Sequence, residues 1–383
     1  MAGSGLGPNE ALVGVPGSRQ LLSTPALVLD LDRLEANVAS MATHAQAHGY
    51  ALRPVAKVHK STEIARRQSA AGALGTCCST LAEAEVLVGA GIAGVLLFTS
   101  VVTAPKLARL AALNARADGL MVAVDEREVL TRLGAAARES GRPLRVLVDV
   151  EVGGGRTGTA DVATAVDLAR RAADTDGLEY AGVQGYNGNH QATVELAARR
   201  ADEAATLDRL RRFVEALAAA GLPPAIVSGG GTGTHDLDHE LGVLTEVQVG
   251  SYVFVDGNYA DAVLRRDDPH PFAPSLTVRT TVVSAAQPGF VVTDAGAKEL
   301  VGLDAAIAPR VLRGAPDGSR YSIVGDDMGR IDLPAEGARP AVGDAVEVLP
   351  PYCYQTVALH ARYHCVRGDQ LVDIWPIDAL AAD

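Results

Sequence analysis

Over the first 270 residues, short apolar runs alternate with longer stretches in which apolar residues recur at helical spacing. Leu34, Val38 and Met41, for example, predict an amphipathic helix over residues 31–49. Eight strand-and-helix units in roughly 230 residues favour a (β/α)8 barrel over an open doubly wound sheet. The apolar runs predict strands at residues 26–30, 52–57, 75–80, 94–100, 119–125, 145–152, 180–187 and 225–230.

The pattern changes near residue 270, after which apolar and polar residues alternate with period two between Gly, Pro and Asp. This alternation predicts an antiparallel β domain. The first 25 residues carry no helix signal, and we expect them to add a strand or an arm to that domain. The chain is therefore predicted to be an α/β protein, with a TIM-type barrel at residues 24–270 and a β domain built from residues 1–23 and 271–383.

The amino-acid composition excludes several classes of protein. Of the 383 residues, 48% are hydrophobic, so the chain can bury a large core, and its net charge of −12 argues against nucleic acid or an anionic membrane as a partner. Four cysteines, two of them adjacent at Cys77 and Cys78, do not form a disulfide framework. Because the sequence also lacks a signal-peptide pattern and a membrane-length apolar run, we expect a soluble, cytoplasmic protein.

Candidate chemistry begins with Lys57, in the stretch RPVAKVHKS at the end of a predicted barrel strand. An unpaired buried ammonium group is costly, and a lysine that extends to the rim of the barrel is the simpler explanation. However, Arg156 follows another predicted strand, and Tyr186 lies at the end of a third. The carboxyl ends of barrel strands are where active sites are built, so these three residues are candidates for one site.

A glycine-rich tract, SGGGTGTHD at residues 228–236, follows the eighth predicted strand. Successive amides without Cβ atoms can surround an anion, and phosphate sites in barrels cluster at this position, although a flexible turn is the alternative. The tract is not a P-loop, because no Gly-Lys-Ser/Thr follows. The G-x-G-x-x-G match at 153–158 lacks the supporting acidic residue and is not taken as a dinucleotide site.

A lysine that faces a phosphate site suggests pyridoxal 5'-phosphate. The aldehyde of this cofactor condenses with a lysine amine, and its ring then accepts electrons from a carbanion. This chemistry would also explain a lysine in apolar surroundings, because a Schiff base tolerates desolvation and desolvation lowers the pKa of the amine.

Six stretches carry a resemblance to a known family. They are TPALVLDLDRLEANV, LRPVAKVHKS, AGALGTCCSTLAEAEVLVGAGI, SGGGTGTHD, EVQVGSYVFVD and LHARYHCVRGDQLVDIWPI. In this order they resemble the D-threonine aldolase and D-serine dehydratase group of fold-type III pyridoxal enzymes, distant relatives of alanine racemase. The resemblance, over about residues 23–378, implies a homodimer with active sites near the subunit interface and a link between Lys57 and the cofactor. It also implies a cofactor site that contains Arg156, Tyr186, Gly230, Gly231 and Thr232.

The sequence departs from this family at its metal site. Relatives carry histidine-x-cysteine or histidine-x-aspartate, whereas PYCYQTV puts Tyr352 and Tyr354 at the ligand positions. Phenols are poor ligands for Mn²⁺ or Zn²⁺, so we predict that no metal binds there. His360 and His364 are no substitute, because four residues of one strand span about 13 Å.

The resemblance implies cleavage of the Cα–Cβ bond of a D-β-hydroxy-α-amino acid to glycine and an aldehyde. Without the metal a side chain must be the base, and His59 is the first candidate because it titrates near neutrality. Tyr352 and Tyr354 come next, since period two would put both on one strand face, although an aromatic packing pair is as good an explanation. Dehydration or racemisation of an amino acid is the alternative activity, and a non-catalytic pyridoxal phosphate carrier is a third hypothesis.

Overall fold

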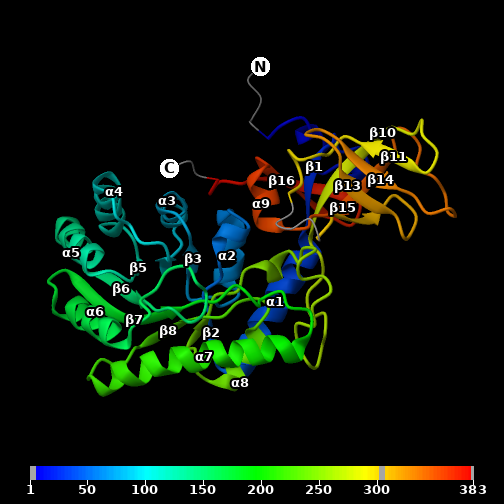
Figure 1. The fold of residues 1–383 in the computed structure, drawn as a ribbon. Coiled ribbons are helices and arrows are strands. Elements are labelled where there is room, and N and C mark those ends of the chain that lie inside the picture. The colour runs from blue at the N-terminus through cyan, green and yellow to red at the C-terminus, as the bar shows by residue number, and fades with distance from the viewer. Residues whose placement is uncertain (1–5, 302–306, 381–383) are drawn as a thin grey trace.

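The computed structural model describes residues 6–301 and 307–380. Eight parallel strands follow one another around a curled sheet in the order β2-β9-β8-β7-β6-β5-β4-β3 (Figure 1). A parallel bridge from Val55 to Cys77 joins the two edge strands, so the sheet curls round into a barrel, as predicted. The strands are β2 (Ala51–Leu52), β3 (Thr76–Cys78), β4 (Val95–Leu97), β5 (Met121–Val124), β6 (Leu144–Asp149), β7 (Leu178–Gly185), β8 (Ile226–Gly229) and β9 (Glu246–Val247).

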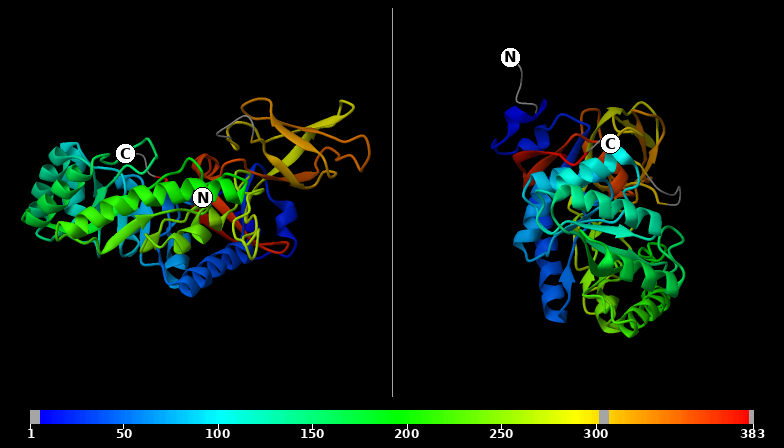
Figure 2. Two further views of the ribbon diagram at one scale, coloured as in Figure 1. Left: turned by 60° about the horizontal axis from the view of Figure 1, so that its bottom comes forward. Right: turned by 90° about the vertical axis from the view of Figure 1, so that its left-hand side faces the viewer.

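Helices cover the outside of this sheet (Figure 2). They are α1 (Leu31–His48), α2 (Thr62–Ala70), α3 (Leu81–Gly89), α4 (Ala104–Asn114), α5 (Arg127–Ser140), α6 (Val162–Asp174), α7 (Leu196–Ala219) and α8 (His235–Leu241). The predicted apolar stripe of α1 is confirmed, because Leu34, Val38 and Met41 are all buried. The side chain of Asp30 caps the start of α1, and Gly49 ends it with a left-handed φ of 71°.

The second unit is a mainly antiparallel sheet, as the period-two pattern predicted. Its central path runs β13-β14-β11-β10-β1-β16-β17, and β15 pairs with both β10 and β12. Its strands are β1 (Ala26–Asp30), β10 (Leu276–Ser284), β11 (Phe290–Thr293), β12 (Arg310–Arg313), β13 (Arg320–Ile323), β14 (Gly329–Asp332), β15 (Ala345–Leu349), β16 (Arg362–Arg367) and β17 (Gln370–Pro376).

The prediction of a barrel strand at residues 26–30 is wrong. Residues 26–30 form β1, which pairs antiparallel with β10 and parallel with β16 and has no partner among the described barrel strands. Residues 26–29 are all buried, so the segment carries the same continuous apolar run as a barrel strand. The eighth barrel strand is instead β9, after the glycine-rich tract, and Lys57 therefore follows the first barrel strand rather than the second.

The N-terminal segment forms an arm along the second sheet. It contains two short 3-10 helices, η1 (Glu10–Leu12) and η2 (Ser18–Leu21), and the amide of Gly14 donates to the carbonyl of Leu371 at 2.8 Å. The arm is held by a buried ion pair, in which Arg19 Nη2 lies 2.7 Å from Glu347 Oε2. The division of the chain at residues 23 and 270 stays a prediction.

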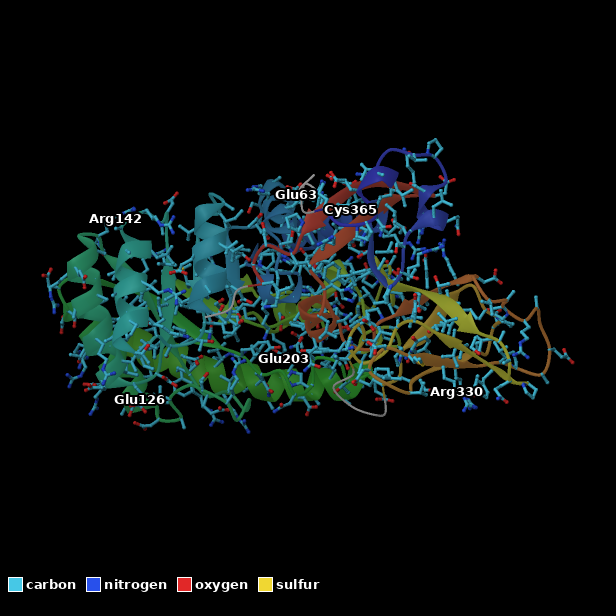
Figure 3. All side chains as sticks on the ribbon, turned by 90° about the horizontal axis from the view of Figure 1, so that it is seen from above. Glu63, Glu126, Arg142, Glu203, Arg330 and Cys365 are labelled. Atoms are coloured by element: carbon cyan, nitrogen blue, oxygen red, sulfur yellow. The ribbon has the colours of Figure 1, made fainter. Side chains whose placement is uncertain are left out.

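The two units lie next to each other along the long direction of the molecule. Seen from above, Arg142 on the α5 side and Arg330 of the antiparallel sheet lie towards opposite ends (Figure 3). The last described helix, α9 (Cys353–Ala358), lies where the two units meet and is in contact with the turn that carries Lys57. Within the described residues, no helix combines the length and apolarity needed to cross a membrane.

Candidate active site

Lys57 lies in a 3-10 turn, η3 (Ala56–Val58), directly after the bridge between Val55 and Cys77. Its side chain is half-buried, and no described residue forms a hydrogen bond or an ion pair with its Nζ atom. The Nζ atom instead lies over two aromatic rings, 5.2 Å from the centroid of Phe98 and 5.4 Å from that of Tyr354. Burial, and then the nearby charge of Arg156, lower the pKa of the Lys57 amine. The neutral, nucleophilic form of this amine is therefore easier to reach than in an exposed lysine.

One pocket collects most of the residues that the sequence singled out. It encloses about 420 Å³ of space between protein atoms, part of it open to solvent. The predicted residues that line it are Lys57, Arg156, Tyr186, Gly231, Thr232 and Tyr354. They come from the ends of different barrel strands and from α9, so only the fold brings them together.

Arg156 and Tyr186 pack together at this pocket. The guanidinium carbon of Arg156 lies 5.4 Å from the Tyr186 ring centroid and 5.9 Å from that of Phe98. The two residues after Arg156 are anchored: the Thr157 hydroxyl donates to Asp149 at 2.7 Å, and the amide of Gly158 donates to Asp125 at 3.0 Å. These contacts hold a positive charge beside the lysine.

The glycine-rich tract forms a close-packed turn between β8 and α8. Gly230 has a left-handed φ of 63°, which favours glycine. A Cβ atom on Gly231 would lie 2.5 Å from Gln191 Oε1, and one on Gly250 would lie 2.7 Å from Val58 Cγ2, so a side chain at either position would displace its neighbour. The Thr232 hydroxyl accepts from the amides of Gly250 and Tyr252, at 3.2 and 3.1 Å.

The backbone amide of Thr232 has no hydrogen-bond acceptor within the described part of the chain. Unpaired amides in buried turns are rare, and an anion is the partner that such a turn accommodates. A phosphate group therefore fits this turn, and an aldehyde fits the unpaired amine of Lys57 across the same pocket. The residues present fit a ligand that carries both an aldehyde and a phosphate group, as pyridoxal phosphate does.

Tyr352 and Tyr354 do not lie on a strand, so the prediction of a shared strand face is wrong. Tyr352 is the N-cap of α9 and Tyr354 is in its first turn. Only Tyr354 lines the pocket, where its hydroxyl accepts a hydrogen bond from Ser251 at 3.3 Å. The start of α9 is fixed by Asp256, whose carboxylate accepts from the amide of Cys353 at 2.7 Å. A helix of six residues is too short to show helical periodicity in the sequence, so period two was misleading here.

His59 is not part of the pocket. Its side chain is completely buried, and its Nδ1 atom accepts a hydrogen bond from the amide of Ser61 at 3.1 Å. Burial lowers the pKa of this imidazole to about 4. The structure does not bring His59 to the reacting groups, because its buried side chain does not line the pocket that contains Lys57.

His360 and His364 form hydrogen bonds instead of a metal site. His364 lies on β16, where Nδ1 is 3.1 Å from the carbonyl of Leu27. His360 lies before that strand, so the prediction that both share a strand is wrong, and its Nε2 is 3.0 Å from the carbonyl of Glu299. Both contacts are the ordinary hydrogen bonds of partly buried imidazoles.

Sequence reasoning missed six further residues of the pocket. They are Val55, Phe98, Gln191, Gln248, Gly250 and Tyr259. Phe98 directly follows β4, and an aromatic residue at the end of a barrel strand was a usable signal. Of the others, all but Val55 lie in loops whose path the sequence does not predict.

A β/α barrel with a lysine and a glycine-rich anion turn at one end, joined to an antiparallel sheet, defines a class of alanine racemase-like enzymes. The family model described as alanine racemase, N-terminal domain, matches residues 29–257, and a model of the serine dehydratase domain matches residues 275–366. The chain belongs to the alanine racemase N-terminal domain family. The family resemblance predicted from the sequence is confirmed.

Several individual relatives are similar to this chain over nearly its whole length. D-threonine aldolase of Arthrobacter sp is 38% identical over 374 residues, covering 97% of this chain and 96% of the relative. 3-Hydroxy-D-aspartate aldolase of Paracoccus denitrificans is 34% identical, over 96% and 94% of the two chains. D-threo-3-hydroxyaspartate dehydratase of Delftia sp. is 31% identical, over 92% and 97%. The crystal structure of D-threonine aldolase from Filomicrobium marinum superposes with a TM-score of 0.90 at 36% identity, over 94% and 96%.

Proposed function

We propose that this protein is a pyridoxal phosphate-dependent lyase that cleaves a D-β-hydroxy-α-amino acid into glycine and an aldehyde. The observation that supports this most is the unpaired, half-buried Lys57 in a pocket with the Gly231–Thr232 turn. The similarity to two aldolases over nearly the whole chain supports the choice of reaction.

The cofactor would be held by residues from several strand ends. Lys57 would bind its aldehyde carbon, the Thr232 amide and its glycine neighbours would bind its phosphate, and the paired side chains of Arg156 and Tyr186 would flank it. When bound, pyridoxal phosphate supplies an electron sink for the negative charge that develops at the substrate Cα.

The proton transfers fall to residues of the pocket. Lys57 Nζ, whose pKa is lowered, is the group suited to accept the proton of the β-hydroxyl and to return a proton to Cα, which balances the cleavage. Burial raises the pKa of the Tyr354 phenol, so this hydroxyl stays protonated. Since it accepts from Ser251, its own hydrogen is free for donation to the substrate oxygen.

The divalent metal of the family does not fit the corresponding residues of this chain. Tyr352 and Tyr354 stand at the ligand positions, and burial raises the pKa of both phenols, which disfavours the phenolate that a metal would need. The described residues that line the pocket include no imidazole, thiol or carboxylate. We therefore propose that the reaction proceeds without this metal, and no step here depends on one.

Dehydration is the second candidate, because the dehydratase of Delftia is 31% identical over most of both chains. In that reaction the β-hydroxyl leaves as water, and Tyr354, a proton donor, is the group that would assist its departure. Racemisation and a non-catalytic carrier role are weaker alternatives, since these relatives are aldolases and a dehydratase.

The activity is tested with purified protein, D-threonine and D-phenylserine, after dialysis against chelator and then with Mn²⁺ restored. Glycine and an aldehyde, formed equally with and without metal, are the expected products. Ammonia and a keto acid would identify a dehydratase, scrambled stereochemistry alone a racemase, and no turnover a carrier. Activity that disappears with the chelator and returns with Mn²⁺ would overturn the metal-independent mechanism.

The cofactor link is tested independently of turnover. Borohydride reduction followed by peptide mass spectrometry should find the pyridoxyl group on Lys57. Lys57→Ala should lose this adduct, whereas Lys60→Ala is a matched control, because Lys60 is paired with Glu83 at 2.5 Å and does not line the pocket. An adduct on another residue of the wild-type protein would contradict the assignment.

We also propose a homodimer and a cytoplasmic location, with a small-molecule amino acid as substrate and no nucleic acid or membrane partner. The family resemblance supports the dimer, and the net charge of −12 supports the absence of anionic partners. Light scattering after gel filtration tests the dimer, for which a mass of about twice that of the chain is expected.

A further inference from the structure

Three histidines meet on the outside of the barrel, away from the pocket. His44 and His48 lie in the last part of α1, and His239 lies in α8. Figure 1 shows the end of α1 reaching α8 at the bottom of the barrel. None of the three lines the pocket that contains Lys57.

The spacing along the two helices explains the cluster. His44 and His48 are four residues apart, which places both on one face of α1. The His239 ring stacks on the His48 ring with centroids 3.8 Å apart, and the His44 ring centroid lies 5.6 Å from that of His239. One ring nitrogen of each of the three residues lies within 4.8 Å of the others.

Two of these imidazoles have buried nitrogen atoms without a partner. His44 is only 8% exposed, and its Nε2 atom has no hydrogen-bond partner among the described residues. The Nδ1 atom of His239 is also buried and unpartnered. Ring stacking explains why the side chains are adjacent, but it leaves these polar atoms desolvated and unsatisfied, which native proteins avoid.

We propose that His44, His48 and His239 form a site for one divalent transition-metal ion with a preference for imidazole, with Zn²⁺ as the first candidate. Three histidines and a water molecule are a known ligand set for Zn²⁺. Ligand nitrogens around a tetrahedral zinc lie about 3.4 Å apart, given Zn–N distances of 2.0–2.1 Å. The cluster must therefore contract, and the exposed His48 side chain is the one free to move.

The charges around the cluster are compatible with a cation. Asp236 Oδ1 lies 3.7 Å from His44 Nε2, so a carboxylate is available next to the ion, although Asp236 also pairs with Arg266. Arg265 is the nearby positive charge, and its Nε atom is engaged with His235 rather than with the three ligands.

A metal at this site would join α1 to α8. Since α8 follows directly from the glycine-rich turn, and His235 Nδ1 lies 2.7 Å from the Thr232 carbonyl, the ion would stiffen the support of that turn. The expected effect is on stability and not on the chemistry of the pocket. The metal-independent activity proposed above is therefore unaffected if this site exists.

The test uses the full-length protein after chelator dialysis, titrated with Zn²⁺ and separately with Co²⁺. We expect one equivalent of Zn²⁺ by equilibrium dialysis, a Co²⁺ absorption spectrum typical of nitrogen ligands and a higher melting temperature with metal. His48→Gln and His239→Gln should each weaken Zn²⁺ binding at least tenfold. His270→Gln is the matched control, because His270 is exposed and lies outside the cluster, and it should bind like the wild type.

Three results would overturn the proposal. They are the absence of stoichiometric binding at micromolar Zn²⁺, equal affinity in the wild type and both cluster variants, and a loss of affinity in His270→Gln as large as in them. The melting temperature of each metal-free variant shows whether it is folded, so a loss of binding through unfolding is distinguished from the loss of a ligand.

Discussion

Tyr352 and Tyr354 stack on each other at the start of α9, with ring centroids 4.8 Å apart and ring planes 13° apart. Their hydroxyl groups have different surroundings, because only Tyr354 lines the pocket and accepts a hydrogen bond from Ser251. The sequence left open whether these tyrosines act in the site or only pack against each other. Both explanations apply, because the two rings stack and the Tyr354 hydroxyl also reaches the pocket.

Removal of the Tyr354 hydroxyl should lower kcat much more than removal of the Tyr352 hydroxyl. We expect Tyr354→Phe to lower kcat by roughly 10²–10³, the range typical of a lost hydrogen-bond donor to a reacting oxygen, with the stacked rings retained. Tyr352→Phe is the matched control and should lower kcat by less than about tenfold. Steady-state kinetics with D-threonine or D-phenylserine measure both, and equal losses would contradict a specific role for Tyr354.

A substitution at His59 should affect stability more than catalysis. In His59→Asn, the side-chain oxygen can replace Nδ1 as the acceptor for the Ser61 amide, but the smaller side chain packs the core less well. We expect a loss of roughly 1–3 kcal/mol in the free energy of unfolding. The kcat should change by less than about tenfold, with an unchanged pH profile. A loss of kcat of several hundredfold in a stably folded variant would restore His59 as the candidate base.

Asp256 should make stability depend on pH in a defined direction. Burial raises the pKa of its carboxyl to about 6, so the folded protein holds this proton more tightly than the unfolded chain. The stabilisation from this group is complete below the unfolded pKa of about 4 and is lost as the pH rises to about 6.

Because Asp256→Asn removes this titration, its free energy of unfolding relative to wild type should increase by roughly 2 kcal/mol between pH 4.5 and 7. Urea unfolding at several pH values measures the difference. Asp317→Asn, at an exposed position, is the control and should show no such trend. A difference that falls as the pH rises would contradict the raised pKa.

The stability of the barrel should depend on a buried ion pair. Arg53, directly after β2, and Glu246, on β9, form two hydrogen bonds of 2.8 Å and are 4% and 3% exposed. Arg53→Met leaves an unpaired buried carboxylate, and we expect it to cost about 3–5 kcal/mol of unfolding free energy.

Adding Glu246→Leu to Arg53→Met should recover part of that loss, because the unpaired charge is removed. An exposed pair provides the comparison: Arg127→Met removes the contact with Asp167 and should cost less than about 1 kcal/mol. If the double variant were less stable than Arg53→Met, the pair would not be the source of the effect. Urea unfolding monitored by circular dichroism gives all of these free energies.

The pattern of apolar residues determined much of the fold without the structure. Helical spacing in residues 31–49 and period two after residue 270 each predicted the correct type of element, because periodicity reports which face of an element is buried. Periodicity does not show which other strand a segment pairs with. Residues 26–30 are buried like a barrel strand, yet they pair with β10 and β16 in the other sheet.

The candidate active site, like the fold, could be predicted only in part from the sequence. The sequence by itself determined that a lysine, an arginine and a glycine-rich tract follow barrel strands, and that phenols replace the metal ligands of the family. Only the tertiary structure decided that Tyr354 enters the pocket while His59 is buried outside it, and that three histidines from α1 and α8 meet. The physical reason is that local sequence governs backbone conformation and the burial of one face, whereas the direction of a side chain and its distance from remote residues depend on how the elements pack.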